Sequence, residues 1–304
     1  MKWTQLKVTC PIERLDQVTA VMSMLDNGLM IEDYSDIEES GFNAVYGELI
    51  DEELLNADRS KAAVSIYIPE VKNYNEYVLF IKERFMMLGV PYEYELIGID
   101  EEDWANSWKQ YYKPIRIGNH VVIVPEWEDY DADTDDVIIR MDPGMAFGTG
   151  THETTRLCAL LIERYMVADS QVLDVGTGSG ILAVTASKLG AKSVFACDID
   201  PAAIKVAREN IVLNEVGNVT CEVSDLLKNV TGVYDFISAN IVADIIIRMA
   251  PDAGKYLKKN GILITSGIIN TQADEVKRVL ESYGFAVIDT VTENDWVAYA
   301  FKKV

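Results

Sequence analysis

The chain has 304 residues, of which 49% are hydrophobic and 25% charged, and its formal net charge is −22. A chain of this length is about twice the size of a typical domain, so we expect two domains. The strong negative charge argues against a broad nucleic-acid-binding surface, which requires clustered lysine and arginine, and suits a basic partner, although a charge that only maintains solubility fits equally well.

Residues 1–99 follow roughly the order β-α-β-β-α-β, with an additional strand-like segment at 42–50 and an acidic stretch at 51–61 that is an insertion or a surface helix. This order is typical of a small ferredoxin-like α+β domain. Alternating apolar residues predict strands at 3–10, 29–34, 42–50, 62–68 and 92–98, and helical spacing predicts helices at 13–25 and 73–88.

The next segment, residues 100–118, carries four aromatic residues at helical spacing: Trp104, Trp108, Tyr111 and Tyr112. We interpret it as a linker helix between the two domains, although aromatic residues of an ordinary core would show the same spacing. Either interpretation places a domain boundary here. The second domain then spans residues 119–304.

Residues 119–304 are dominated by alternating strands and helices, which predict a mainly parallel, doubly wound α/β sheet. Two strand-like segments, 120–125 and 136–142, and a helix at 153–166 precede this series. An antiparallel pair at its end fits the seven-stranded, Rossmann-like methyltransferase architecture. Strands are predicted at 171–175, 193–197, 219–223, 234–239, 261–266, 285–291 and 296–302, and helices at 181–189, 201–213, 243–258 and 271–283.

The strongest local signal is VLDVGTGSG at 172–180, in which an apolar strand runs into a glycine-rich turn and then a helix. Glycines such as Gly176 and Gly178 let the backbone approach a ligand closely. The spacing is GxGxG, because Ile181 replaces the last glycine of the dinucleotide fingerprint. Asp174 would repel a pyrophosphate and attract a cationic amino-acid end, which favours S-adenosylmethionine over NAD. A turn with a purely structural role remains the alternative.

An acidic residue follows the next strand at the distance expected for a ribose ligand. Asp198 lies 22 residues after Gly176, directly behind the apolar segment SVFAC. A carboxylate about 20 residues after the turn is placed to accept hydrogen bonds from two ribose hydroxyls. We assign this role to Asp198, because Asp200 is placed to cap the helix that begins at Pro201.

Strand four ends at Asn240, and in an open α/β sheet ligands bind near the carboxyl ends of strands. The amide of Asn240 offers both an acceptor and donors, so it can hold a cofactor or orient an incoming amine. We take it as the candidate catalytic residue. The sequence after it is Ile-Val-Ala, and the lack of an aromatic residue to stack on a flipped base disfavours a nucleic-acid base as substrate.

The segment DPGMAFGTGTHETTR, residues 142–156, is rich in glycine and threonine and leads into the helix before strand one. We expect this loop to fold over the cofactor cleft. Its hydroxyls can then reach the cofactor's carboxylate, and Phe147 can cover the reacting sulfonium. A plain connecting loop has the same composition.

Neither a metal site nor a membrane segment is indicated. The two histidines, His120 and His152, do not form HExxH, and the four cysteines include no CxxC pair. The sequence contains no GxSxG motif, which would indicate a hydrolase. No apolar run is long enough for a membrane span and the first residues carry no signal core, so we expect a cytoplasmic protein.

Four segments, DPGMAFGTGTHETTR, VLDVGTGSGIL, CDIDPAA and ANIVADII, occur in this order and spacing. With the linker pattern between Trp104 and Gly118, they resemble the bacterial family of ribosomal protein L-eleven (L11) methyltransferases. The resemblance is strong over about residues 100–304 and extends to the first hundred residues only in general layout. The loop motif is specific to the family, whereas the glycine turn is common to its superfamily.

The resemblance implies an S-adenosylmethionine-dependent enzyme that trimethylates the N-terminal α-amine and lysine ε-amines of ribosomal protein L11. Residues 1–99 are implied to grip this substrate and present its amines. Direct nucleic-acid contact is not needed, and a monomer is expected. Four residues match the family's cofactor-binding positions and two more are implied neighbours: Thr155, Gly176, Asp198 and Asn240, with Gly178 and Phe147.

Two other functions remain open at this stage. One is a methyltransferase for small molecules, in which the first domain acts as a lid. The other is a non-catalytic protein that senses the cofactor or docks on ribosomes. The intact set of candidate residues argues against the non-catalytic protein, and the separate first domain and acidic charge favour a basic macromolecular substrate.

Overall fold

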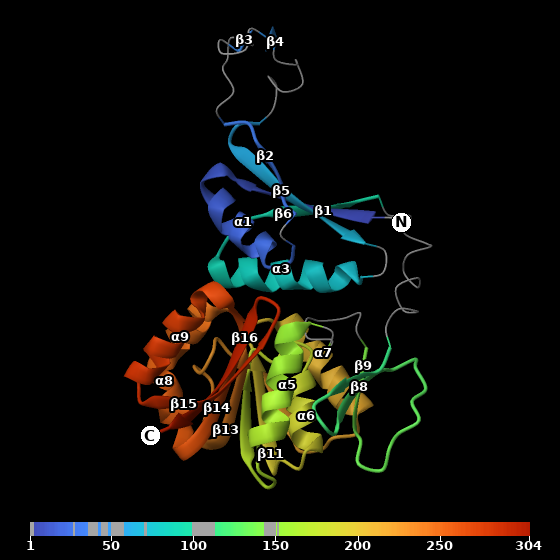
Figure 1. Ribbon diagram of the computed structural model, residues 1–304, viewed down its shortest axis with the longest axis vertical. Coiled ribbons are helices and arrows are strands. Elements are labelled where there is room, and N and C mark those ends of the chain that lie inside the picture. Colours follow the sequence, from blue (N-terminus) through green and yellow to red (C-terminus); the bar gives the residue numbers. More distant parts are fainter. Residues whose placement is uncertain are drawn as a thin grey trace. The chain divides into compact units, whose positions relative to one another are not determined.

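The computed structural model describes residues 3–26, 28–35, 42–43, 48–49, 58–69, 72–98, 113–142, 150 and 152–304. The chain divides into two compact units, Met1–Tyr111 and Tyr112–Val304 (Figure 1). Each unit has its own sheet and helices. Within the described residues, no helix combines the length and apolar character needed to cross a membrane.

The first unit contains a four-stranded antiparallel sheet in the order β2-β5-β1-β6. Two helices contact each other and lie on one face of the sheet (Figure 1). This is the ferredoxin-like arrangement that the element order predicts. Its elements are β1 (Trp3–Pro11), α1 (Leu15–Ser23), β2 (Met30–Asp33), β5 (Lys61–Pro69), α3 (Tyr74–Leu88) and β6 (Glu93–Ile97), with a short 3₁₀ helix at Ile12–Arg14.

The predicted strand at 42–50 differs from the structure. In this segment the structure has two short strands, β3 (Phe42–Asn43) and β4 (Glu48–Leu49). They pair with each other and lie outside the four-stranded sheet. Because β3 and β4 pair antiparallel, they run in opposite directions and are not parts of one strand. The acidic stretch predicted as an insertion or surface helix lies largely outside the described residues.

The core of the first unit forms because alternate side chains of its strands face the helices. In β1, Leu6 and Val8 are fully buried while their neighbours are partly exposed. Helix α3 contributes Phe80 and Phe85, also fully buried. Its first turn is capped by Asn73, whose side chain accepts a hydrogen bond from the backbone of the second residue after it.

The second unit contains a seven-stranded sheet in the order β12-β11-β10-β13-β14-β16-β15. Neighbouring strands among β10 to β14 are parallel, and β16 runs antiparallel between β14 and β15. The predicted series and its antiparallel end are confirmed. The strands are β10 (Gln171–Val175), β11 (Ser193–Asp198), β12 (Val219–Val223), β13 (Tyr234–Asn240), β14 (Leu257–Ile269), β15 (Phe285–Glu293) and β16 (Trp296–Lys303).

Helices cover both faces of this sheet (Figure 1). Helices α5, α6 and α7 contact one another in sequence on one face, and α8 packs against α9 on the other. Two-sided cover explains why β10 and β13 are almost continuously buried. The helices are α5 (Glu153–Tyr165), α6 (Ile181–Lys188), α7 (Pro201–Leu213), α8 (Ala243–Tyr256) and α9 (Asn270–Ser282).

A small second sheet precedes α5 and corrects part of the linker prediction. Strand β7 (Ile115–Ile117) pairs antiparallel with β8 (Val121–Pro125), which pairs in parallel with β9 (Val137–Met141). The predicted linker helix over 100–118 is therefore wrong at its end. Pro114 disfavours helix at the residue before it, and two β-branched isoleucines alternate along β7. Residues 101–112 lie outside the described part of the chain.

Candidate cofactor and amine site

The glycine-rich turn after β10 is held between two neighbouring strands. The backbone N–H of Gly176 donates to the carbonyl of Cys197 at 2.8 Å. Gly176 has φ +70°, and a Cβ atom there would lie 2.3 Å from Cγ2 of Ile241, just after β13. Both the backbone angle and the lack of space exclude a larger residue. The turn therefore lies at the reversal of strand order, where α/β sheets bind ligands.

Asp198 closes β11 and faces this turn. Its Oδ2 accepts the backbone N–H of Gly178 at 2.9 Å, and its Oδ1 accepts that of Asp200 at 3.0 Å. The side chain is buried, which raises its pKa, while the two N–H donors counteract the shift. Each carboxylate oxygen retains a second lone pair. Asp198 can therefore accept hydrogen bonds from ribose hydroxyls while it orders the turn.

Asp200 has the capping role that the sequence predicts. Its side chain accepts a hydrogen bond from the backbone N–H of Ala202 at 2.7 Å, in the first turn of α7. Pro201 occupies the first helical position, where its missing N–H costs nothing. The two neighbouring acids are thus separated by function: Asp200 caps a helix and Asp198 faces the turn.

Asp174 ties the turn to β13. Its Oδ2 accepts the hydroxyl of Thr177 at 2.6 Å, and its Oδ1 accepts that of Ser238 at 2.7 Å. Complete burial raises the pKa of Asp174 to about 6. Burial disfavours the charged form of this carboxyl group, and its two hydroxyl donors partly offset that effect. Its hydrogen bonds show that it also braces the two strands, a role that the sequence analysis did not assign to it.

Asn240 and Thr155 meet at the end of β13. The Nδ2 of Asn240 donates to Oγ1 of Thr155, in the first turn of α5, at 3.5 Å. The Oδ1 atom of Asn240 is buried and has no hydrogen-bond partner among the described residues. A buried, unsatisfied carbonyl costs on the order of 1–3 kcal/mol. An external N–H or O–H donor at this position would remove that cost.

The start of α5 is braced by the hairpin of β15 and β16. His152 caps the helix, because its Nδ1 accepts the backbone N–H of Thr154, and its ring packs edge-on against Trp296 with centroids 5.1 Å apart. Arg156 pairs with Glu293 at 2.5 Å. These contacts hold the turn of α5 that carries Thr155. His152 is thus a helix cap in this structure.

Comparison with known proteins identifies the family. A model of the family described as Ribosomal protein L11 methyltransferase (PrmA) matches residues 2–304. The chain belongs to this family. It is therefore a methyltransferase enzyme with the Rossmann-like fold, as the sequence analysis expects.

Individual members of the family cover the chain almost completely. The chain is 41% identical to the Ribosomal protein L11 methyltransferase of Caldanaerobacter subterraneus subsp. tengcongensis, over 100% of this chain and 99% of that protein. Identity to the Clostridium perfringens protein of that name is 40%, over 97% and 96% of the two chains. The crystal structure of ribosomal protein L11 methylase from Lactobacillus delbrueckii subsp. bulgaricus matches with a TM-score of 0.61 and 42% identity, over 64% of this chain and 100% of that chain.

The structure brings most of the candidate residues together at the carboxyl ends of β10, β11 and β13. Gly176 contacts the residue after Asn240, Asn240 contacts Thr155, and Gly178 binds Asp198. Phe147 lies outside the described residues, so its predicted position over the sulfonium stays a prediction.

Two residues that the sequence analysis did not select also border this site. Ser266 in β14 donates its hydroxyl to the carbonyl of Thr154 at 2.9 Å. Gly267 has φ +80°, and a Cβ atom there would lie 2.5 Å from the carbonyl oxygen of Ile241 and 3.2 Å from Oδ1 of Asn240. The available signal was an isolated glycine inside an apolar strand, which indicates a bulge or a close backbone approach.

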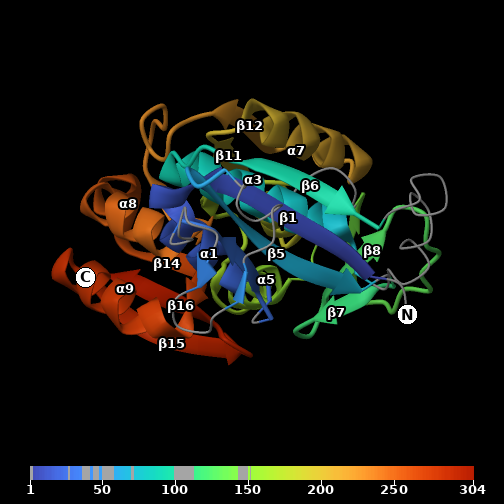
Figure 2. The same cartoon turned by 90° about the horizontal axis from the view of Figure 1, so that it is seen from above.

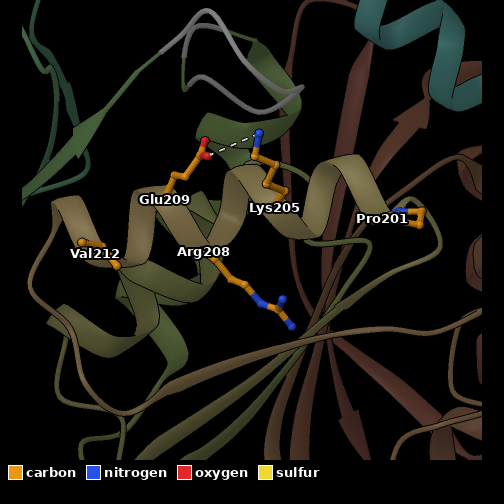
Figure 3. Close-up of a pocket in the computed structure, with 5 residues that line it drawn as sticks. All are labelled: Pro201, Lys205, Arg208, Glu209 and Val212. Carbon is orange, nitrogen blue, oxygen red and sulfur yellow. Dashed lines mark ion pairs between the residues drawn. The ribbon is translucent and has the colours of Figure 1, made fainter.

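A separate hollow lies along the outer side of α7 and contains none of the candidate residues (Figure 3). Lys205 and Glu209 pair across one turn, and Arg208 points the other way to donate to the carbonyl of Cys221 at 2.7 Å. In the part of the chain that the structure describes, no group of three or more His, Cys, Asp or Glu residues is arranged to hold a metal ion. The described candidate residues lie outside this hollow.

The raised pKa of Asp174 predicts a pH-dependent stability difference. Because the folded pKa of about 6 exceeds the usual 3.8, burial favours the protonated form. The stabilising contribution is complete below about pH 4 and is lost as the pH rises through 6. A rise of this size in the pKa of Asp174 corresponds to on the order of 3 kcal/mol. Relative to Asp174→Asn, the wild-type free energy of unfolding should decline across this window.

Urea unfolding of both proteins between pH 4 and 8, followed by circular dichroism, measures this difference. Asp198 also has a raised pKa, but it is present in both proteins and cancels to first order. A difference in unfolding free energy that does not change with pH would contradict the titration assigned to Asp174.

Proposed function

We propose that this chain transfers methyl groups from S-adenosylmethionine to amino groups of ribosomal protein L11. The groups are the N-terminal α-amine and lysine ε-amines. The proposal follows from the family match over residues 2–304. One observation within the site supports it. The buried Oδ1 of Asn240 lacks a partner among the described residues, at the strand end where the fold binds ligands.

The residues around the turn fit the chemical groups of S-adenosylmethionine. Asp198 offers carboxylate lone pairs for the ribose hydroxyls, and Gly176 allows close approach of the backbone. Thr155 and Asn240 supply polar groups beside them. When bound, S-adenosylmethionine supplies an electrophilic methyl group on a sulfonium. Asp174 holds the glycine-rich turn against β13 through its two hydroxyl hydrogen bonds.

The contribution of Asn240 is to orient the amine. Only a neutral amine has a lone pair for methylation, and an α-amine, with a reference pKa near 8, loses its proton more readily than lysine, near 10.4. The Oδ1 atom of Asn240 can accept an amine N–H and so direct the nitrogen lone pair. Lysine additionally requires surroundings that disfavour its charged form, which burial from water provides.

The proposed partner agrees with the chain's charge. A net charge of −22 attracts a basic protein over long range and repels nucleic acid. We assign substrate recognition to the first unit and methyl transfer to the second, with the protein acting as a monomer that needs no direct nucleic-acid contact. We place the activity in the cytoplasm, because the proposed substrate is a ribosomal protein.

Mass spectrometry tests the reaction directly. Unmethylated ribosomal proteins incubated with the enzyme and S-adenosylmethionine should show methyl-group mass gains on L11, mapped to its N-terminus or lysines. A mixture of ribosomal proteins supplies the internal control, because the other proteins should remain unchanged. If L11 gains no mass while the enzyme still binds its cofactor, the protein substrate is wrong and small-molecule acceptors become the next candidates.

Asp198→Ala should weaken cofactor binding roughly ten-fold or more, because a charge-assisted hydrogen bond to the ribose is lost. Calorimetric titration with S-adenosylmethionine measures the dissociation constant. Asp200→Ala is the matched control, since it removes the neighbouring carboxylate but only a helix cap worth about 1 kcal/mol. Equal effects of the two substitutions, or an unchanged constant in Asp198→Ala, would contradict the ribose assignment.

Asn240→Ala should lower kcat for L11 roughly ten-fold or more, because the amine loses its orienting acceptor. Steady-state methylation assays with saturating cofactor measure this change, and circular dichroism checks the fold. Asn229→Ala, which removes a surface side chain bonded to the carbonyl of Val223, should leave kcat unchanged. A folded Asn240→Ala enzyme with normal turnover would remove Asn240 from the reaction.

A further inference from the structure

Strand β14 carries a β-bulge beside Asn240. Its pairing with β16 shifts register between Thr265 and Ile268. The two residues between them, Ser266 and Gly267, therefore oppose a single residue of β16. On its other side, the pairing of β14 with β13 sets Ser266 next to Asn240. Bulges of this kind change the direction of a side chain and are common next to active sites.

The Ser266 side chain reaches the start of α5. In Figure 2, α8 and α9 lie on one side of β14 and β16, and α5 lies on the other, in contact with both strands. The hydroxyl of Ser266 donates to the backbone carbonyl of Thr154 at 2.9 Å, and both residues are almost completely buried. A carbonyl oxygen has two lone pairs, so this bond leaves the carbonyl able to accept the usual helical N–H as well. Ser266 therefore fixes the first turn of α5 to β14.

The residue after Thr154 is the one that contacts Asn240. The Oγ1 atom of Thr155 accepts from Nδ2 of Asn240 at 3.5 Å, which is longer than an ordinary N–H···O bond. At that length, a small displacement of the α5 turn breaks the contact and no longer fixes the amide of Asn240. Gly267 lies close to the other amide atom, since a Cβ atom there would lie 3.2 Å from Oδ1. The two residues of the bulge thus act on both partners of the Asn240–Thr155 contact.

We propose that Ser266 is a positioning residue for methyl transfer. Through the carbonyl of Thr154, it holds Thr155 where the amide of Asn240 keeps its orientation and its Oδ1 atom is available to a ligand. The hydroxyl hydrogen of Ser266 is used by that carbonyl, so Ser266 acts through α5. The role of Ser266 in turnover rests on the function proposed above, whereas the tie between β14 and α5 belongs to the fold itself.

Ser266→Ala tests the proposal. The kcat for L11 should fall roughly five-fold or more, because a displaced Thr155 leaves the amine acceptor misoriented. The dissociation constant of S-adenosylmethionine, measured by calorimetry, should rise roughly three-fold, since Thr155 is also a candidate cofactor residue. KM for L11 should stay within about two-fold, because β14 has no assigned part in binding the protein substrate. If Ser266→Ala does not fold, Ser266→Cys fills the same space with only a weak donor and should show the same changes.

Ser170→Ala is the matched control. The hydroxyl of Ser170 also donates to a backbone carbonyl, that of Val167, and the residue is buried. It directly precedes β10 and so lies at the end of that strand remote from the candidate residues. Loss of this bond should lower stability to a similar degree, as urea unfolding measures, and leave kcat and cofactor affinity unchanged. An equal loss of kcat in Ser170→Ala would assign the effect to stability and overturn the proposal.

A double-mutant cycle with Thr155→Val separates positioning from a general structural role. In the Thr155→Val enzyme, Ser266→Ala should change kcat by less than about two-fold, because the contact that it positions is already absent. Its effect on the free energy of unfolding should remain, since the bond to Thr154 is intact in that background. Equal losses of kcat in both backgrounds, or wild-type kcat and cofactor affinity in Ser266→Ala, would overturn the proposal. If the wild type binds S-adenosylmethionine but leaves L11 unmethylated, the proposed function fails instead, and the calorimetric comparison still tests Ser266.

Discussion

The parallel pairing of β10 with β11 on one side and β13 on the other determines where the candidate residues lie. The strand order reverses between β10 and β13. The connection after β10 leads to β11 on one side, and the connection after β13 leads to β14 on the other side. The space between them is where α/β folds bind ligands. Gly176 meets Ile241 across this gap at a distance that leaves no room for a side chain. The other hydrogen bonds of the site surround the point where Gly176 meets Ile241.

Buried polar groups stabilise this arrangement and also explain its chemistry. Asp174 satisfies both carboxylate oxygens with hydroxyl groups from the turn and from β13, so its burial is compensated by hydrogen bonds. Asp198 does the same with backbone donors. Asn240 differs, because its side-chain nitrogen Nδ2 contacts Thr155 while its oxygen Oδ1 has no partner among the described residues. A site with satisfied acids and one unsatisfied amide oxygen is prepared for a ligand with hydrogen-bond donors.

The first unit contributes a surface of another kind. Its helices cover one face of the four-stranded sheet, and the opposite face carries the exposed side chains of Tyr67, Ile97 and Glu93. A protein substrate needs such a broad surface, because contacts with one amine cannot select among the many amines of other proteins. In the proposed division of labour, the first unit selects the protein and Asn240 orients the amine.

The sequence by itself determined the order and bounds of most elements, because periodicity, helix caps and glycine turns act over a few residues. The cap at Asp200, the start of α7 at Pro201 and the turn at Gly176 all follow from local residue types. It also placed Asp198 and Asn240 at the ends of strands, where α/β sheets bind ligands, whereas Thr155 was implied only by the resemblance to the family.

Only the tertiary structure decided which distant segments meet. It placed Gly267 beside Asn240, gave Asp174 a hydroxyl partner 64 residues away in Ser238, and made a strand of Ile115–Ile117 where a helix was predicted. It also decided that Tyr67 and Ile97 are exposed together on one face. These outcomes depend on pairing between strands far apart in the chain, and no local pattern records which strand a residue will pair with.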